Sequence, residues 1–266
     1  MIRRIGSILL ALAASGQALA QRSSSAAEFR YTQAQLACAG FEEHSRARLD
    51  GQTGTRVRRE TLTRDGLLQL RARPAGRALR IEAWYDSLSL TRESAEGTLT
   101  PDTDGLLGGR YRGKLTATGR YTAEARPFIP DEVAEVAELS AAMDDLLPPL
   151  PPVALSVGQH WTDSSGLELR RLSDSTAGKR VIRRLALRSR IETGRATVRG
   201  DTLTLPARQT TVEEGQIGWE PTEGLVRRDR HIVVETSVPA GGPLRQPLRS
   251  RLEQDITLVR VGCSPL

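Results

Sequence analysis

The side chains best suited to chemistry in this sequence are three histidines, His44, His160 and His231. No two of them have the i, i+4 spacing of a zinc-binding helix, and neither cysteine lies near one, which argues against a zinc site. Asp163 and Ser164 closely follow His160. However, catalytic triads are assembled from separate elements, and the G-x-S-x-G nucleophile elbow is absent. We therefore predict a polar loop there and no hydrolase site.

Acidic residues offer no stronger site. The segment Asp102-x-Asp104-Gly105 is similar to the start of a calcium loop, but the third ligand position and the closing glutamate are missing. Adjacent acids such as Glu42 and Glu43 point to opposite faces of a strand, so they do not form a shared acid–base site. We predict a turn at 102–105, no metal, no cofactor and no catalytic residue.

The first twenty residues have the order of a secretory signal peptide. Arg3 and Arg4 precede a short apolar run, and Ala18-Leu19-Ala20 forms a cleavage box before Gln21. The apolar run is too short to span a bilayer, and no later run is long enough. We predict cleavage near Ala20-Gln21, export to the periplasm or the extracellular space, and no transmembrane segment.

The chain contains two cysteines, Cys38 and Cys263. In an exported protein an even pair of cysteines indicates a disulfide bond. We predict that Cys38 and Cys263 are bonded. The bond would place the first and last strands side by side.

Arginine dominates the charged residues. The chain has 38 basic residues, of which only Lys114 and Lys179 are lysine, and a formal net charge of +6. A basic chain can indicate nucleic-acid binding. Here the arginines are spread along nearly every expected strand, and aromatic residues, at 4%, are too few for a stacking platform. We therefore expect no nucleic-acid partner.

Short alternating segments separated by turn residues predict β-strands in most of the chain. Arg64-Asp65-Gly66 predicts a hairpin turn. The expected fold is mainly β, with curved antiparallel sheets forming a half-barrel or two lobes, and one central α-helix packed on the concave face. The expected parts are a signal peptide 1–20, a flexible leader 21–35, a first β half 36–128, a helix and proline-rich joint 129–152, and a second β half 153–266.

Residues 130–147 have the clearest helical pattern. Pro130 suits the first helical position, apolar residues recur at three- and four-residue steps, and the proline run that follows ends the helix. The segment from Asp131 to Asp145 holds six acids and no base, so we expect arginines of the sheet to face it. The apolar stripe either completes the core or binds a ligand. The candidate ligand-binding residues are Val136, Leu139, Met143, Leu146 and Trp161.

The joint after this helix, Leu147-Pro148-Pro149-Leu150-Pro151 followed by Val157-Gly158-x-x-Trp161, resembles a family of exported bacterial β-rich proteins of unknown function. The glycine-rich stretch from Asp104-Gly105 to Gly119 and the hairpin from Gly218 to Gly224 are similar too. The resemblance implies an envelope or secreted protein and transfers no catalytic residue. In architecture alone, a curved sheet with a helix on its concave face is also similar to periplasmic lipoprotein carriers.

Together these features predict an exported, non-catalytic protein that binds an apolar small molecule or an envelope protein. One alternative is a hydrolase-like enzyme with an unrecognised site. Another is a purely structural envelope protein.

Overall fold

The computed structural model of the protein describes residues 26–197, 204–241 and 244–263. Its helical segments are α1 (Gln33–Leu36), η1 (Asp104–Leu106), α2 (Asp131–Ala134) and α3 (Ala142–Leu146). Its strands are β1 (Ala39–Thr53), β2 (Arg56–Ala75), β3 (Ala78–Ser94), β4 (Gly97–Leu99), β5 (Tyr111–Leu115), β6 (Tyr121–Ala125), β7 (His160–Thr162), β8 (Glu168–Ala177), β9 (Arg180–Thr197), β10 (Thr204–Glu220), β11 (Gly224–Val238) and β12 (Leu248–Val261).

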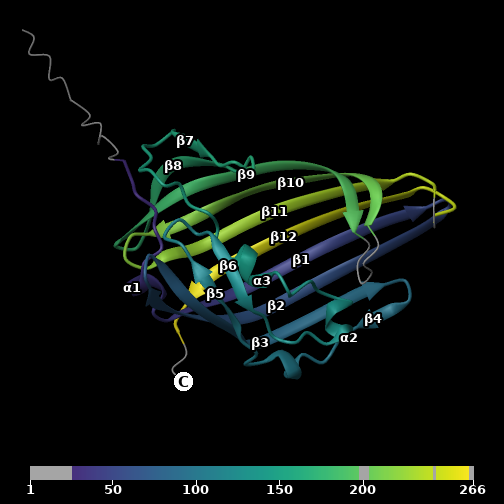
Figure 1. Ribbon diagram of the computed structural model, residues 1–266, viewed down its shortest axis with the longest axis horizontal. Helices are drawn as coiled ribbons and strands as arrows, with labels where there is room; N and C mark the ends of the chain where they lie inside the picture. Colours follow the sequence, from purple (N-terminus) through teal and green to yellow (C-terminus); the bar gives the residue numbers. More distant parts are fainter. Residues whose placement is uncertain (1–25, 198–203, 242–243, 264–266) are drawn as a thin grey trace, which may run out of the picture.

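These strands form one twelve-stranded antiparallel sheet, which is curved and not closed on itself (Figure 1). The strand order is β6-β5-β3-β2-β1-β12-β11-β10-β9-β8-β7, and β4 pairs with β3 off this path. The expectation of a mainly β fold with a curved antiparallel sheet is confirmed. The sequence left open a half-barrel or two lobes, and the structure has one continuous sheet.

The first and last strands join the two parts of the sheet. β1 pairs with β12 from Gly40 opposite Val261 to Thr53 opposite Leu248. The disulfide bond between Cys38 and Cys263 lies at one end of this pair, with 5.6 Å between the two Cα atoms. Both the predicted disulfide and the predicted neighbourhood of the terminal strands are confirmed.

The two faces of the sheet differ in burial. Along β1, Phe41 is buried, whereas its neighbour Glu42 and the next outward residue, His44, are exposed. We name the face of Phe41 the inner face and the face of His44 the outer face. Residues 100–159, with α2 and α3, cover part of the inner face and share one apolar core with it (Figure 1). We name the end of the sheet with the disulfide the near end. The opposite end, with the β1–β2 and β11–β12 turns, is the far end.

The hairpin turn predicted at Arg64-Asp65-Gly66 is wrong. β2 runs through these residues, with Arg64 opposite Ser45 and Gly66 opposite Glu43. Gly66 faces the ring of Tyr85, and a Cβ atom at this position would lie 3.0 Å from a carbon of that ring. Glycine is therefore needed here for close packing within a strand, which is a recognised alternative to a turn.

The single central helix is also wrong in detail, because the segment forms two short helices, α2 and α3. Between them the side chain of Glu138 accepts a hydrogen bond from the amide of Ser140, and the carbonyl of Leu139 accepts one from the hydroxyl of Tyr111. These local and tertiary bonds replace helical ones. No described helix is long and apolar enough to cross a membrane.

The leader expected to be flexible is packed from residue 26 onward, so that expectation is wrong for 26–35; residues 21–25 lie outside the described residues. Ala27, Phe29 and Tyr31 are buried in the core. The Phe29 and Tyr31 rings meet Trp219 edge-on, with centroids 6.1 and 5.2 Å away. The Tyr31 hydroxyl donates to the carbonyl of Pro148 at 3.0 Å. Two aromatic contacts and one buried hydrogen bond thus offset the polar composition that suggested a flexible leader.

Candidate functional site

Four of the five predicted ligand-binding residues lie together in the core. Val136, Leu139, Met143 and Leu146 are between 0% and 7% exposed. Trp161 lies on the edge strand β7, half-buried and opposite Leu169, and packs against the same core from its margin. The stripe thus completes the core around the inner face. A ligand would reach it only if the segment 131–147 moved away from the sheet.

A group of charged residues lies on the inner face where this cover ends. Arg64 of β2 forms an ion pair with Glu43 of β1, and both side chains are mostly buried. Glu43 also accepts a hydrogen bond from the hydroxyl of Tyr85 at 3.2 Å. Burial on its own would lower the pKa of Arg64, but the Glu43 carboxylate outweighs it and raises that pKa. Burial, aided by the same carboxylate, raises the pKa of Tyr85 well above its ordinary value. Under ordinary conditions Arg64 is therefore charged and Tyr85 neutral.

A second buried ionic cluster lies across the sheet on β10 and β11. Glu213 lies 2.6 Å from Arg230 and 3.5 Å from Arg228. Arg228 also donates to the carbonyl of Leu146, at the end of α3, at 3.5 Å. Between the two clusters, Gln254 donates to the hydroxyl of Ser45 at 2.8 Å. We name these inner-face residues the polar band: Glu43, Ser45, Arg64, Glu213, Arg228, Arg230 and Gln254.

Beyond the polar band, toward the far end, the next row of the inner face is mostly aliphatic from β9 to β1. It ends at the buried Glu60 of β2, which is opposite Leu49 and pairs with Arg58. Cross-strand register places Ile191, Thr211, Val234, Leu252 and Leu49 in one row across β9, β10, β11, β12 and β1. Ile191 is 44% exposed, and the other members are half-buried. The part of the chain that the structure describes has two clusters of buried apolar residues, and neither cluster includes a residue of this row. We name Ile191, Val234, Leu252 and Leu49 the aliphatic row.

Strand spacing gives the size of this surface. Neighbouring strands lie about 4.8 Å apart, so the five strands from β9 to β1 span about 19 Å. Ile232 and Ala47 lie in the adjacent row, where Gln254 stands between them and Glu213 is opposite Ile232, so the apolar surface is confined to the aliphatic row. Directly opposed side chains on a sheet are close enough to form a continuous surface. The uncovered inner face is therefore wide enough for an elongated apolar molecule.

Catalytic chemistry gains no support from the predicted polar loop. The Asp163 carboxylate accepts hydrogen bonds from the amides of Ser165 and Leu167 and from the Ser165 hydroxyl. Burial works against this carboxylate, but the hydrogen bonds outweigh it and lower the pKa of Asp163. Asp163 thus stabilises a turn. His160 is paired with Arg170 in the strand ladder and is exposed.

The other two histidines are on the outer face. His44 pairs with Asp65, and His231 contacts Asp255 at 2.8 Å. Both pairs are exposed, so they are weak surface interactions. Within the described ranges, no group of three or more His, Cys, Asp and Glu side chains is arranged to hold a metal ion.

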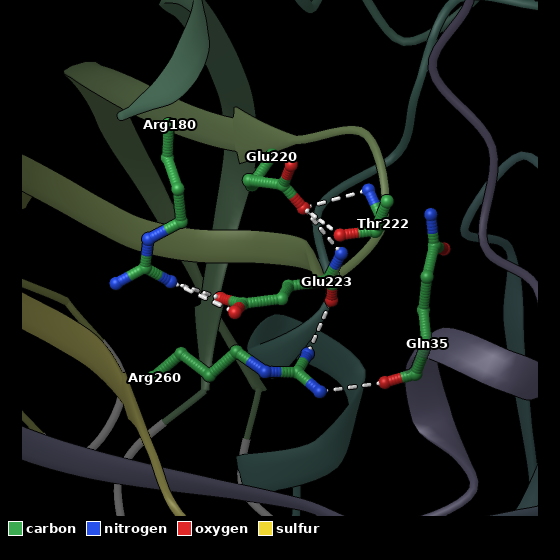
Figure 2. Close-up of polar contacts among 6 residues, drawn as sticks. All are labelled: Gln35, Arg180, Glu220, Thr222, Glu223 and Arg260. Carbon is green, nitrogen blue, oxygen red and sulfur yellow. Dashed lines mark hydrogen bonds and ion pairs between the residues drawn. The ribbon is translucent and has the colours of Figure 1, made fainter. Parts of the chain in front are cut away.

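The near end is closed by a polar network between α1 and the β10–β11 turn (Figure 2). Glu220 accepts three hydrogen bonds of 2.6 Å, from the amide and hydroxyl of Thr222 and the amide of Glu223. Arg260 of β12 donates to the carbonyls of Glu223 and Gln35. Arg180 binds both carboxylate oxygens of Glu223, at 2.8 and 2.9 Å. The network ties four segments together, and its hydrogen bonds indicate a structural role.

Sequence patterns did not reveal the polar band or the aliphatic row. Alternation in β12 did indicate that Leu252 and Leu258 share a face. Which residues of β1, β10 and β11 lie beside them depends on register, which alternation does not specify. The β1–β2 register places Arg64 opposite Ser45 and Gly66 opposite Glu43. Glu43 and Arg64 are therefore diagonal neighbours on the same face, close enough to form an ion pair.

Comparison with known proteins adds little to this description. No family model matches the chain, and no curated protein matches it. Among solved structures, the chain is similar to lipovitellin, in a structure concerned with lipid–protein interactions in that protein, with a TM-score of 0.45 and 10% identity. The match covers 86% of this chain and 26% of the lipovitellin chain. The similarity to a lipid-carrying β-rich protein is loose and says nothing of what this chain binds.

Proposed function

We propose that the protein binds an elongated apolar ligand, such as the acyl chain of an amphiphile, on the uncovered part of the inner face. The observation that carries the proposal is the aliphatic row, in which Leu49, Leu252 and Val234 lie side by side and Ile191 follows beyond Thr211. All four aliphatic side chains remain partly exposed. An exposed apolar surface of this extent is uncommon on a soluble monomer and marks a place for ligand or partner. Binding would remove it from water.

The polar band would give the ligand a direction. Ion pairs that are already buried cannot accommodate an apolar chain without further desolvation, which costs several kcal/mol per charge. The chain would therefore extend from the band toward the far end. A polar head group would lie at the band, beside the Ser45 hydroxyl and the Gln254 amide.

The predicted stripe at Val136, Leu139, Met143 and Leu146 would be a second surface for the same ligand. Its residues are now core, so their use would require the segment 131–147 to separate from the sheet. Export, supported by the signal-peptide pattern and the Cys38–Cys263 bond, would place this activity in the cell envelope.

Native mass spectrometry tests the proposal directly. Protein purified from its own envelope should carry a lipid-sized adduct that is lost after organic extraction. A clean mass before extraction would count against a stably bound ligand.

A pair of variants locates the site. Val234 and Val233 are neighbours on β11 that face opposite sides of the sheet, and both are half-buried. Fully burying a valine side chain contributes about 1.5–3 kcal/mol. At most about a third of Val234 remains exposed, so losing that contact and covering a glutamine amide instead would together cost roughly 1 kcal/mol. Val234→Gln should therefore weaken binding of dansyl-labelled undecanoic acid by about fivefold, and Val234→Gln with Leu252→Gln by about 25-fold or more. Val233→Gln should bind as the parent does. Equal affinity of all four proteins would reject the inner face as the site.

A further inference from the structure

The far end of the sheet is basic at the β1–β2 and β11–β12 turns, whereas the β3–β4 turn beside β2 carries Glu93 and Glu96. The turn segments 51–59 and 236–250 carry no acidic residue and five arginines: Arg56, Arg58, Arg59, Arg245 and Arg249. All five arginines are exposed. Arg58 and Arg59 pair with Glu60 and Asp50 further along the strands. The other three arginines form no ion pair with any residue that the structure describes.

The arginines continue onto the outer face beside this end. Register places Arg208, Ser237, Arg249, Gln52 and Val57 in one row across β10, β11, β12, β1 and β2. Every side chain in this row is exposed, and Val57 is 61% exposed. A shallow hollow of about 620 Å³ adjoins the row and is lined by Arg59, Arg208, Arg249 and Arg251 together with Asp50 and Glu235. The surface thus combines unpaired positive charge with one exposed aliphatic tip.

We propose that this surface docks on an anionic lipid bilayer. We name it the arginine end: Arg56, Val57, Arg58, Arg59, Arg208, Arg245 and Arg249. The proposal rests on the proposed function, because docking here would bring the aliphatic row to the lipid from which its ligand comes. Leu49 of that row is four residues before Thr53 at the turn, about 14 Å along the strand. An acyl chain on the row would therefore leave or enter the protein at the docked end.

Charge and shape both favour a lipid surface as the partner. Anionic head groups attract basic segments. Each arginine at the surface raises the membrane partition coefficient about fivefold. Phosphate oxygens suit the guanidinium fork, and Val57 can enter the interface between head groups. An acidic protein would supply charge but would not explain why the arginines surround the open end of an apolar surface.

Vesicle flotation tests this docking, with matched variants at the two ends of β2. Arg56→Gln with Arg249→Gln removes two unpaired arginines from the far end. Arg73→Gln with Arg77→Gln removes two exposed arginines near the β2–β3 turn, at the near end. Vesicles of phosphatidylcholine mixed with phosphatidylglycerol should bind the parent at low salt. Binding should fall about 25-fold in the far-end variant and stay within about twofold in the near-end variant. About 1 M salt, which reduces the Debye length to about 3 Å, should release the protein.

Three results would overturn the proposal. Vesicle binding could fall equally in both variants, the parent could fail to bind the anionic vesicles, or the parent could bind polyglutamate in place of vesicles. Affinity for dansyl-labelled undecanoic acid, measured without vesicles, separates this proposal from the proposed function. The far-end variant should keep its affinity for the labelled acid. The variant with Val234→Gln and Leu252→Gln should lose that affinity and still bind the anionic vesicles. Circular dichroism and thermal unfolding check that each exposed substitution leaves the fold intact.

Discussion

Replacing both cysteines tests how far the fold depends on joining its ends. The Cys38–Cys263 bond spans a sequence separation of 225 residues. In the chain-entropy treatment, opening a loop of that length enlarges the unfolded ensemble and lowers the free energy of unfolding by about 5 kcal/mol. Domains are typically stable by only about 5–15 kcal/mol. Cys38→Ser with Cys263→Ser should therefore lose a third or more of its stability.

Urea unfolding followed by tryptophan fluorescence measures this loss, because Trp219 is buried at the near end and becomes exposed when the chain unfolds. The parent in reductant should match the double variant, and the double variant itself should not respond to reductant. The dependence of the free energy on urea should become steeper, since an unbridged chain exposes more surface when it unfolds. A difference below about 1 kcal/mol between parent and variant would refute the loop-entropy reasoning.

Three further predictions concern single positions. Arg64→Met should cost about 3–5 kcal/mol because Glu43 stays buried without its partner, and adding Glu43→Gln should recover much of that loss in a double-mutant cycle of urea unfolding. Gly119→Ala should destabilise the protein by more than Gly76→Ala, as measured by thermal unfolding. Both backbones have positive φ, +83° and +66°, but a Cβ atom at Gly119 would lie 2.4 Å from a backbone oxygen, whereas none is near at Gly76. Glu220→Gln should cost about 1–3 kcal/mol at neutral pH. Burial alone would raise the pKa of the Glu220 carboxyl group, but the three hydrogen bonds outweigh burial and lower that pKa. The stabilisation by Glu220 is therefore complete above pH about 4.5 and is lost as the pH falls through the folded pKa. Parent and variant should have the same stability below that pH.

The connectivity of the sheet was accessible from sequence because two cysteines marked strands at opposite ends of the chain. Cys38 and Cys263 predicted the β1–β12 neighbourhood, and this pairing makes the two parts of the protein one sheet. The apolar spacing at Val136, Leu139 and Met143 likewise identified residues that the core buries. These predictions needed only pairwise or local information.

The break in the central helix was not accessible in the same way. The carbonyl of Leu139 accepts from the amide of Ala142, three residues on, and from the hydroxyl of Tyr111, a residue 28 positions earlier. Helical spacing in the sequence was satisfied, but it carries no information about this tertiary hydrogen bond. Gly66 shows the same limit, because only the position of Tyr85 on the next strand explains why glycine is needed within β2.

The polar band was hidden by the abundance of arginine. Alternating arginines occur on nearly every strand, so Arg64 and Arg230 look like the exposed ones in sequence. Both are mostly buried, each against a glutamate on a neighbouring strand. Register alone distinguishes them, and register is set by pairing along the whole strand.

The position of the polar band gives the sheet its functional asymmetry. On the near side of the band, residues 100–159 cover the inner face, and Arg228 reaches the carbonyl of Leu146 at the border. On the far side, the aliphatic row has no comparable cover within the described chain. Buried ion pairs fix the border, because sliding the cover across them would remove the charges further from water. Under the proposed function, an apolar ligand would therefore extend away from the band, toward the end where the arginines meet solvent.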